Sequence, residues 1–446
     1  MGQQLQAFAL AALLPLGLCA DATAQTYALV ELAPPEPGRV FTRGLNSDGQ
    51  VVGHWDREVY DGDRAFIWQS GIFTDLGGFG SSGGTLRDIS ETGIATGSVF
   101  DQNGVAEAVV WQDGTLTRLG TLGGLSSDGY GVNAQGEVVG HSRTLEGNRH
   151  AFYFDGVTMH DLGTLGGLNS TAYAINDAGV VVGESEDSSG KVRAFRWEAG
   201  TMLDLGTLGG AESTARDITE SGTVVGESDL NSGRRLGFMW RDGQISALDG
   251  GVTQSGATSM SADETVVGYA QTSDWGGPAR WTLSGGWQRI ASLILDPGQW
   301  QISSGNVTRI NDLGWIAGHA QPSSNSGLNH GFVLIPYDLP DRMQLSDPVP
   351  GLAGRVNTFT VTAAVPGATV YLGYGFRAGQ TPIPGCPGVV VSIAAVRTGG
   401  SALVGVDGSA VIEGFVPGTA RHVQLYFQMA DADNCIISNR VTFRFQ

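Results

Sequence analysis

The stretch DLGTLGGLNSTAYAINDAGVVVGESEDSSGKVRAFRWEAG, residues 161–200, decides the fold because the chain repeats it. The most regular marker of the repeat is the glycine that ends each VVG-like pair. This glycine is found at Gly53, Gly97, Gly140, Gly183, Gly226, Gly268 and Gly318, in steps of 44, 43, 43, 43, 42 and 50 residues. A fixed period of this length indicates a solenoid, a propeller or an array, with seven copies here. The longer last step predicts an enlarged crossing loop around residues 291–301.

Each copy reads as four short strands joined by tight turns. In the fourth copy the predicted strands are 171–175, 180–185, 191–197 and 201–205, and a GTLGG segment crosses to the next copy. Asn176 and Gly179 occupy the first and fourth positions of a type I turn followed by a bulge. Four strands per copy, apolar on both faces, favour a β-propeller in which stacked copies bury what one sheet cannot. The Phe and Trp of each third strand are expected to pack between blades.

The two ends of the repeat segment complement each other. Residues 29–32 align with the fourth strand at 202–205, and no fourth strand follows residues 330–334 in the seventh copy. We therefore expect an all-β, seven-bladed propeller over residues 25–336, closed by its N-terminal strand. Closure removes the exposed edges that an open stack would leave.

Residues 1–24 read as a secretory signal peptide. FALAALLPLGL is an apolar run too short to span a bilayer, and Ala22-Thr23-Ala24 suits cleavage before Gln25. Cys19 raises lipid attachment as an alternative, but Leu18 is too large for the small residue that this signal needs. The formal charge of −19 disfavours nucleic acid and anionic membranes as partners. We expect a secreted, extracellular or periplasmic monomer without a membrane span.

The combined motifs DLGTLGG, S-x-A-x-x-IN, GxVVGxS and HAFxW resemble the HAF repeat of extracellular bacterial proteins. The resemblance covers about residues 26–336, and five copies match it well. It implies export and a tandem arrangement, and it brings no catalytic residues to this chain.

The repeat period is lost after a proline-interrupted linker at residues 337–351. Residues 352–446 alternate as about seven strands, which is typical of an immunoglobulin-like β-sandwich. This part resembles the small sandwich modules appended to secreted bacterial propellers. Cys386 and Cys435 are the cysteines left after signal removal, and we expect them to form a disulfide in an oxidising compartment.

Motifs for catalysis are weak in this chain. Gly78–Gly83 matches GxGxxG but opens no predicted helix, so a dinucleotide site is not expected. Gly183-Glu184-Ser185 and its two counterparts start like a GxSxG nucleophile motif but lack its last glycine. The short loops at Asp187 and Asp229 have too few ligands for calcium. We expect no cofactor, with at most a loosely bound divalent cation.

Two repeat positions are candidates for a ligand-binding face. The residue after the marker glycine and the residue opening the third strand should border the variable loops between the second and third strands. A constant frame with variable rim loops is how scaffolds usually carry binding. The candidate ligand-binding residues are His54, His141, Glu184, Glu227, His319, Arg64, His150, Arg193 and His330. The alternative is simple cross-strand pairing on a solvated rim, such as Glu184 with Arg193.

Three function classes remain open from the sequence. The favoured one is a non-catalytic extracellular binding or scaffold protein with a protein or glycan ligand. The alternatives are a propeller hydrolase or lyase with a site on one face, and a structural component of the cell envelope. Fold alone does not distinguish them.

Overall fold

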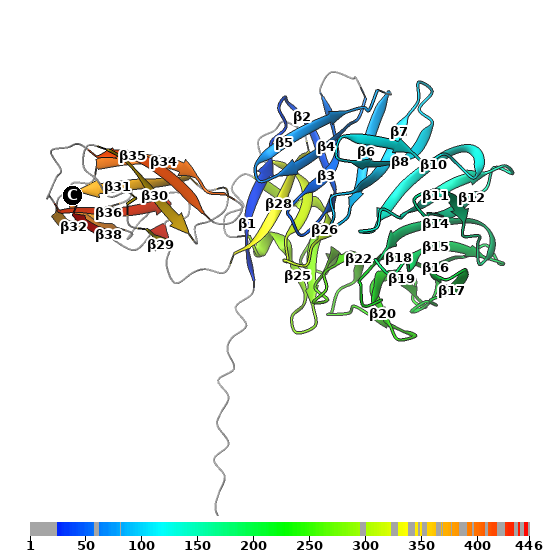
Figure 1. Cartoon of the computed structure of the whole chain (residues 1–446). Helices are drawn as coiled ribbons and strands as arrows, with labels where there is room; N and C mark the ends of the chain where they lie inside the picture. Colours follow the sequence, from blue (N-terminus) through cyan, green and yellow to red (C-terminus); the bar gives the residue numbers. More distant parts are fainter. Residues whose placement is uncertain are drawn as a thin grey trace, which may run out of the picture.

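The computed structural model shows an all-β chain (Figure 1). It describes residues 25–57, 62–80, 82–294, 300–322, 329–337, 344–346, 348–349, 355–362, 367, 369–375, 377–382, 390–394, 397–405, 409–416, 424–431, 436–437 and 441–444. The predicted signal peptide, Cys19, Cys386, Cys435 and most of the linker lie outside these residues, so their assignments stay predictions. No helix in the described ranges is long and apolar enough to cross a membrane.

The predicted seven-bladed propeller is confirmed. Each repeat forms an antiparallel four-stranded sheet whose strands pair in chain order. The first three sheets are β2 (Gly38–Leu45), β3 (Val51–Arg57), β4 (Arg64–Gln69) and β5 (Ile72–Gly77); β6 (Gly83–Ile89), β7 (Ala95–Phe100), β8 (Ala106–Gln112) and β9 (Thr115–Arg118); and β10 (Gly123–Val132), β11 (Val138–Thr144), β12 (Arg149–Phe154) and β13 (Met159–Asp161). The next three are β14 (Gly166–Ile175), β15 (Val181–Asp187), β16 (Val192–Glu198) and β17 (Thr201–Asp204); β18 (Gly209–Ile218), β19 (Val224–Leu230), β20 (Arg235–Arg241) and β21 (Gln244–Ala247); and β22 (Gln254–Met260), β23 (Val266–Gln271), β24 (Gly276–Thr282) and β25 (Gly286–Arg289).

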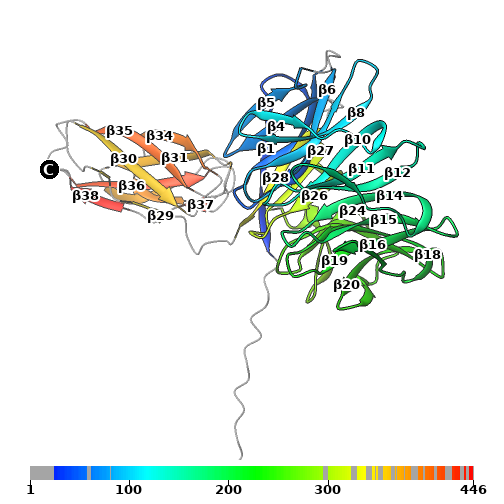
Figure 2. The same ribbon diagram turned by 45° about the vertical axis from the view of Figure 1, so that its right-hand side comes forward.

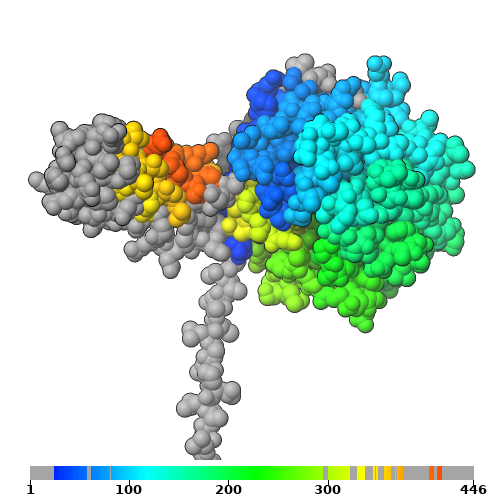
Figure 3. All heavy atoms as spheres, viewed as in Figure 1, coloured from blue at the N-terminus to red at the C-terminus, as the bar shows by residue number. Residues whose placement is uncertain are grey.

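The seventh sheet contains strands from both ends of the repeat segment. β1 (Thr26–Leu32) pairs antiparallel with β28 (His330–Tyr337), which is followed by β27 (Ile316–Pro322) and β26 (Trp300–Ile310). Figures 1 and 2 both show β1, in blue, beside β28, in yellow. The first strand of each sheet contacts the first strands of its neighbours in the chain, and β2 also contacts β26. Figure 3 shows the successive repeats following one another across the visible face of a rounded body.

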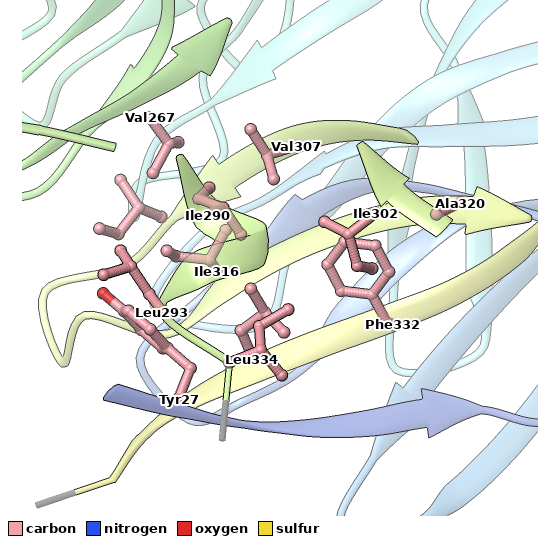
Figure 4. Packing of buried hydrophobic residues seen from close by; sticks show 12 residues of the cluster. Tyr27, Val267, Ile290, Leu293, Ile302, Val307, Ile316, Ala320, Phe332 and Leu334 are labelled. Carbon is pink, nitrogen blue, oxygen red and sulfur yellow. The ribbon is translucent and has the colours of Figure 1, made fainter. Parts of the chain in front are cut away.

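Apolar clusters fill the spaces between sheets. Phe66, Phe152, Phe195, Phe238 and Phe332, from the third strands, are fully buried, as expected from the HAFxW segment. Figure 4 shows one such cluster, in which Phe332 and Leu334 of the seventh sheet pack with Ile290, Val307 and Tyr27. Ile290 belongs to the short 3₁₀ helix η1 (Ile290–Ser292), which occupies part of the longer crossing predicted in the sixth copy.

The predicted turn is present, but the strand limits differ from those expected. The N–H of Gly179 donates to the carbonyl of Asn176 over 3.0 Å, and Gly179 has a φ of 75°, which glycine adopts without cost. β14 begins at Gly166 rather than at residue 171, because Gly166 already pairs with Asp187 of an extended β15. The GTLGG segment is therefore partly strand, and the loop between the second and third strands is shorter than predicted.

Main-chain hydrogen bonds from motif side chains explain much of the repeat. The hydroxyls of Ser142, Ser185 and Ser228 accept N–H bonds of 2.8–2.9 Å from Leu122, Leu165 and Leu208. These GxS serines are thus buried structural groups. The Ser170 hydroxyl accepts from Ala151 N–H (2.8 Å) in the preceding sheet and donates to Gly163 O (2.6 Å). The same bonds recur at Ser127 and Ser213.

Residues beyond the repeats form further sheets. β30 (Arg355–Thr362) lies between β29 (Gln344–Leu345) and β35 (Ala410–Val416). A second sheet is ordered β34 (Arg397–Leu403), β31 (Thr369–Gly375), β36 (Gln424–Asp431), β37 (Ile436–Ile437), with β38 (Val441–Arg444) also paired to β36; β32 (Arg377–Pro382) and β33 (Val390–Ala394) form a hairpin. The immunoglobulin-like topology stays a prediction.

The marker glycine of each repeat is required by a close backbone approach. A Cβ on Gly183 would overlap the carbonyl oxygen of Thr171 and lie 2.9 Å from Cε1 of Phe195. We expect Gly183→Ala to lower the free energy of unfolding by about 3 kcal/mol, since neither the strand nor the buried ring has room to move. Gly190→Ala is the matched control, because no atom lies within 4 Å of its Cβ position. Its positive φ predicts a loss of about 1 kcal/mol. Urea unfolding of the two variants measures both, and equal losses would contradict this explanation.

Candidate functional site at the propeller axis

A β-bulge in every inner strand directs one side chain toward the propeller axis. The pairing register shifts by one residue in each of the seven strands, for example between Ala172 and Ala174 in β14. Such bulges commonly re-aim a side chain next to a functional site. The residues at the shift are Arg43, Arg87, Tyr130, Tyr173, Arg216, Thr258 and Thr308.

These seven bulge residues line one cavity of about 560 Å³. Phe41, Asn306 and His319 complete the wall together with Val307 and Arg309. Since all seven sheets contribute to it, we call this cavity the axial pocket. Its volume lies within the range of small-molecule sites, about 300–1,000 Å³. Its wall combines guanidinium groups, aromatic rings and hydroxyls, although the chain as a whole is acidic.

Two arginines of the axial pocket lie against tyrosine rings of neighbouring blades. The Arg87 guanidinium lies 4.8 Å from the ring centroid of Tyr130, and Arg216 lies 4.7 Å from that of Tyr173. Arg87 Nη2 is 3.5 Å from Asp128, and Arg216 Nη2 donates to Glu227 over 2.9 Å. Two of the three bulge arginines therefore have a carboxylate partner.

A buried ion triad separates the axial pocket from a second axial cavity. Arg309 lies 3.0 Å from Asp88 and 3.1 Å from Asp217, so it joins the seventh, second and fifth sheets. Arg309 lines the axial pocket and also a cavity of about 200 Å³ formed by the turns after the inner strands. Burial opposes the charge on Arg309, but Asp88 and Asp217 outweigh it and raise the pKa of the guanidinium. The remaining oxygens of the two carboxylates accept N–H bonds from Val132 and Met260.

The predicted residues that follow the marker glycine surround the axial pocket. His319 lines it directly. His54 stacks on Phe41 at 4.9 Å between ring centroids, and His141 lies 5.7 Å from Tyr130. Glu184 accepts from the hydroxyls of Tyr173 (2.9 Å) and Thr214 (3.0 Å), and Glu227 holds Arg216. His319 thus belongs to the lining, and the other four residues contact side chains of the lining.

The predicted residues that open the third strands lie away from the axial pocket. Arg64 pairs with Asp75 (2.6 Å), His150 with Asp161 (2.8 Å) and His330 with Glu31 (2.6 Å). Arg193 Nε donates to Asp187 over 3.2 Å and not to Glu184, because Arg193 faces Ser185 in the register. The expected Glu184–Arg193 pair is therefore wrong. The two candidate positions do not form one site.

Sequence reasoning missed the bulge residues, which form most of the lining. Their signal is present in the sequence, since each lies two residues before the apolar residue that ends the inner strand, as Tyr173 does before Ile175. Arginine or tyrosine occupies that position in five copies and threonine in the other two. Strand alternation alone does not show that a bulge turns them toward the axis.

Burial keeps the histidines around the axial pocket neutral. Burial, aided by the charges of Arg43, Arg87 and His319, lowers the pKa of His54 to about 3. Burial lowers the pKa of His319 to about 4, again with a contribution from Arg43. The pKa of His141 is lowered to about 4 by burial, against the opposing charge of Asp128. In the described residues no group of three or more His, Cys, Asp or Glu side chains is arranged to hold a metal ion.

Comparisons with known proteins give only distant structural matches. No family model matches the chain, and no curated protein matches it in sequence. Solved propellers are similar in fold. The β-propeller domain of the trilobed protease from Pyrococcus furiosus is 10% identical, covers 69% of this chain and 95% of its own, and gives a TM-score of 0.43. Pyrococcus horikoshii acylaminoacyl peptidase is 9% identical over 73% of this chain and 58% of its own, with a TM-score of 0.44. A fungal alcohol oxidase is 13% identical over 95% and 99%, with a TM-score of 0.42. At these identities the likeness extends to the fold alone.

The ion triad predicts an asymmetric response to substitution. Arg309→Met leaves Asp88 and Asp217 buried and unpaired, so we expect a loss of about 3–5 kcal/mol in the free energy of unfolding. The triple variant Arg309→Met, Asp88→Asn, Asp217→Asn should recover much of this loss. Urea unfolding provides the measurement, with Arg241→Met, at a half-exposed arginine paired with Glu264, as control. If Arg241→Met lowered the free energy of unfolding as much as Arg309→Met, the loss could not be assigned to the buried carboxylates of the triad.

The lowered histidine pKa values predict acid sensitivity. A histidine whose folded pKa lies below its unfolded value of about 6.5 stabilises the fold fully above that pH. The stabilisation is lost as the pH falls from about 6.5 toward 4, by about 1.4 kcal/mol per pH unit for each histidine. We expect the unfolding free energy of His54→Phe to depend less steeply on pH over this range than that of the unmodified chain. Urea titrations at several pH values measure the two slopes, and equal slopes would refute the assignment to His54.

Proposed function

We propose that this propeller is a secreted, non-catalytic binding protein of the HAF-repeat type, and that it takes its ligand, a glycan or an extended part of a protein, in the axial pocket. The observation that carries the proposal is the pocket itself. Seven bulges place seven side chains of three kinds, arginine, tyrosine and threonine, around one cavity, while the surrounding frame repeats almost unchanged. A constant scaffold that presents variable side chains at one point is the usual arrangement of a binding site.

Unpartnered polar atoms in the wall support binding at this place. Nε of Arg43 and of Arg87, and Nδ1 of His319, are buried and have no hydrogen-bond partner in the described structure. Leaving such groups unsatisfied costs free energy, so the polar side chains of this wall are not arranged for stability alone. The serines and glutamates that resemble catalytic residues have structural hydrogen bonds. The GxS serines bond to main-chain atoms, and Glu184 and Glu227 accept hydrogen bonds from neighbouring side chains.

A glycan array with a matched pair of variants tests the proposal. Thr258→Trp places a large ring in the axial pocket, whereas Thr115→Trp places it on the exposed outer strand β9. We expect the unmodified chain and Thr115→Trp to bind the same glycans, and Thr258→Trp to lose at least about tenfold in affinity. Circular dichroism checks that both variants fold.

The same array separates the alternative function. Incubated glycans are analysed for cleavage products, which a binding protein leaves unchanged. Products that appear with the unmodified chain and Thr115→Trp, but not with Thr258→Trp, would replace the proposal with a hydrolase or lyase. Binding that Thr258→Trp does not weaken would place the ligand elsewhere.

A further inference from the structure

One arginine in the axial pocket has no carboxylate within ion-pair distance among the described residues. Arg87, Arg216 and Arg309 each lie within 3.5 Å of a carboxylate. Arg43 lines the same pocket, yet it forms no ion pair with any described residue, and its Nε has no hydrogen-bond partner. The charges of the pocket are therefore unevenly paired, because the first sheet contributes an arginine that Asp63 influences only from a distance.

The side chains next to Arg43 form a mixed aromatic and polar wall. Phe41 stacks on His54 and meets the edge of His319 at 5.2 Å between centroids. His319 is 7% exposed, and its Nδ1 is unpartnered. The Asn306 amide lies 3.5 Å from the other ring nitrogen of His319. The hydroxyls of Thr42 and Thr308 meet at 3.2 Å between the first and seventh sheets. A ring with hydroxyl groups would find both an apolar face and hydrogen-bond partners here.

We propose that the Arg43 side of the axial pocket binds the carboxylate of an acidic sugar, with the guanidinium holding the carboxylate and the Phe41 side packing against the sugar ring. The inference rests on the proposed function and names its ligand class. A planar guanidinium with free N–H groups matches a carboxylate in a bidentate pair. Aromatic side chains supply the flat contact surface that a sugar ring needs.

The charges deeper in the pocket argue for one carboxylate rather than a phosphate. Only Arg43 lacks a partner, so only one positive charge is available to the ligand. The triad reaches the same pocket through Arg309 and, with both Asp88 and Asp217 ionised, carries one excess negative charge. A dianion would be repelled by that excess, whereas a monoanion at Arg43 is matched. Burial and the neighbouring charge of Arg87 lower the pKa of Arg43, and they outweigh the opposing effects of Tyr130 and Asp63.

Calorimetric titration of the full chain tests the inference with four probes: D-glucuronate, D-glucose, acetate and inorganic phosphate. We expect glucuronate to bind at least about tenfold more tightly than glucose, because a charged hydrogen-bonded pair is lost with the neutral sugar. Acetate should be weaker than glucuronate because it lacks the ring. Arg43→Met should remove the preference for glucuronate, Arg43→Lys should restore part of it, and the control Arg241→Met should leave it unchanged.

Histidine resonances provide a readout that needs no variant. Glucuronate bound at Arg43 lies beside His54 and His319, so it should shift their imidazole signals, while glucose at the same concentration should not. This measurement keeps the inference falsifiable if Arg43→Met does not fold.

Three results would overturn the inference, and they differ in what they leave standing. Equal binding of glucose and glucuronate, both lost in Thr258→Trp, would remove the carboxylate subsite but leave the binding function in place. Phosphate binding as tight as that of glucuronate would contradict the single-charge argument. An unmodified chain that binds neither sugar, while Thr258→Trp still binds array glycans, would remove both proposals.

Discussion

The structure depends on buried hydroxyls that replace main-chain partners between neighbouring sheets. Ser170 accepts the N–H of Ala151 in the preceding sheet and donates to the carbonyl of Gly163 in the crossing segment. One side chain thereby satisfies two main-chain groups that no strand ladder reaches, in a place where an unsatisfied group costs about 1–3 kcal/mol. At the opposite ends of the inner strands, the amides of Asn46, Asn133, Asn176 and Asn311 donate to a carbonyl of the next sheet. The third and fourth blades are therefore tied to a neighbouring blade at both ends of their inner strands.

The sequence was sufficient for the architecture because these ties are made by motif residues. The spacing of the glycines, the turn at Asn176–Gly179 and the buried phenylalanines all depend on local chemistry that recurs in each copy. The axial pocket was predicted only in part. His54 and His319 follow a visible marker, whereas Arg43 and Tyr173 are directed by bulges. A bulge is a property of two paired strands, so the alternation of residues in one strand does not reveal it.

The contrast between frame and pocket also explains why an acidic chain presents arginines at its axis. Asp and Glu side chains are distributed over the surface and the turns, where water solvates them. At the axis, seven side chains converge from seven sheets, and like charges there would repel strongly. Only three of the seven bulge positions hold arginine, the other four hold tyrosine or threonine, and Asp128 and Glu227 offset two of the cations. The electrostatic character of the site is thus set at the bulges, almost independently of the net charge.

The triad of Arg309, Asp88 and Asp217 has an implication for how such a chain evolves. Tandem repeats readily gain or lose a copy by unequal recombination, and nearly identical copies tolerate the exchange. Here three non-equivalent copies, the second, fifth and seventh, meet through charges that only this copy number and order bring together. Losing or duplicating one repeat would separate Arg309 from Asp88 or Asp217 and leave a buried charge without its partner. The buried ion pairs of Arg309 therefore disfavour any change in the number or the order of the blades.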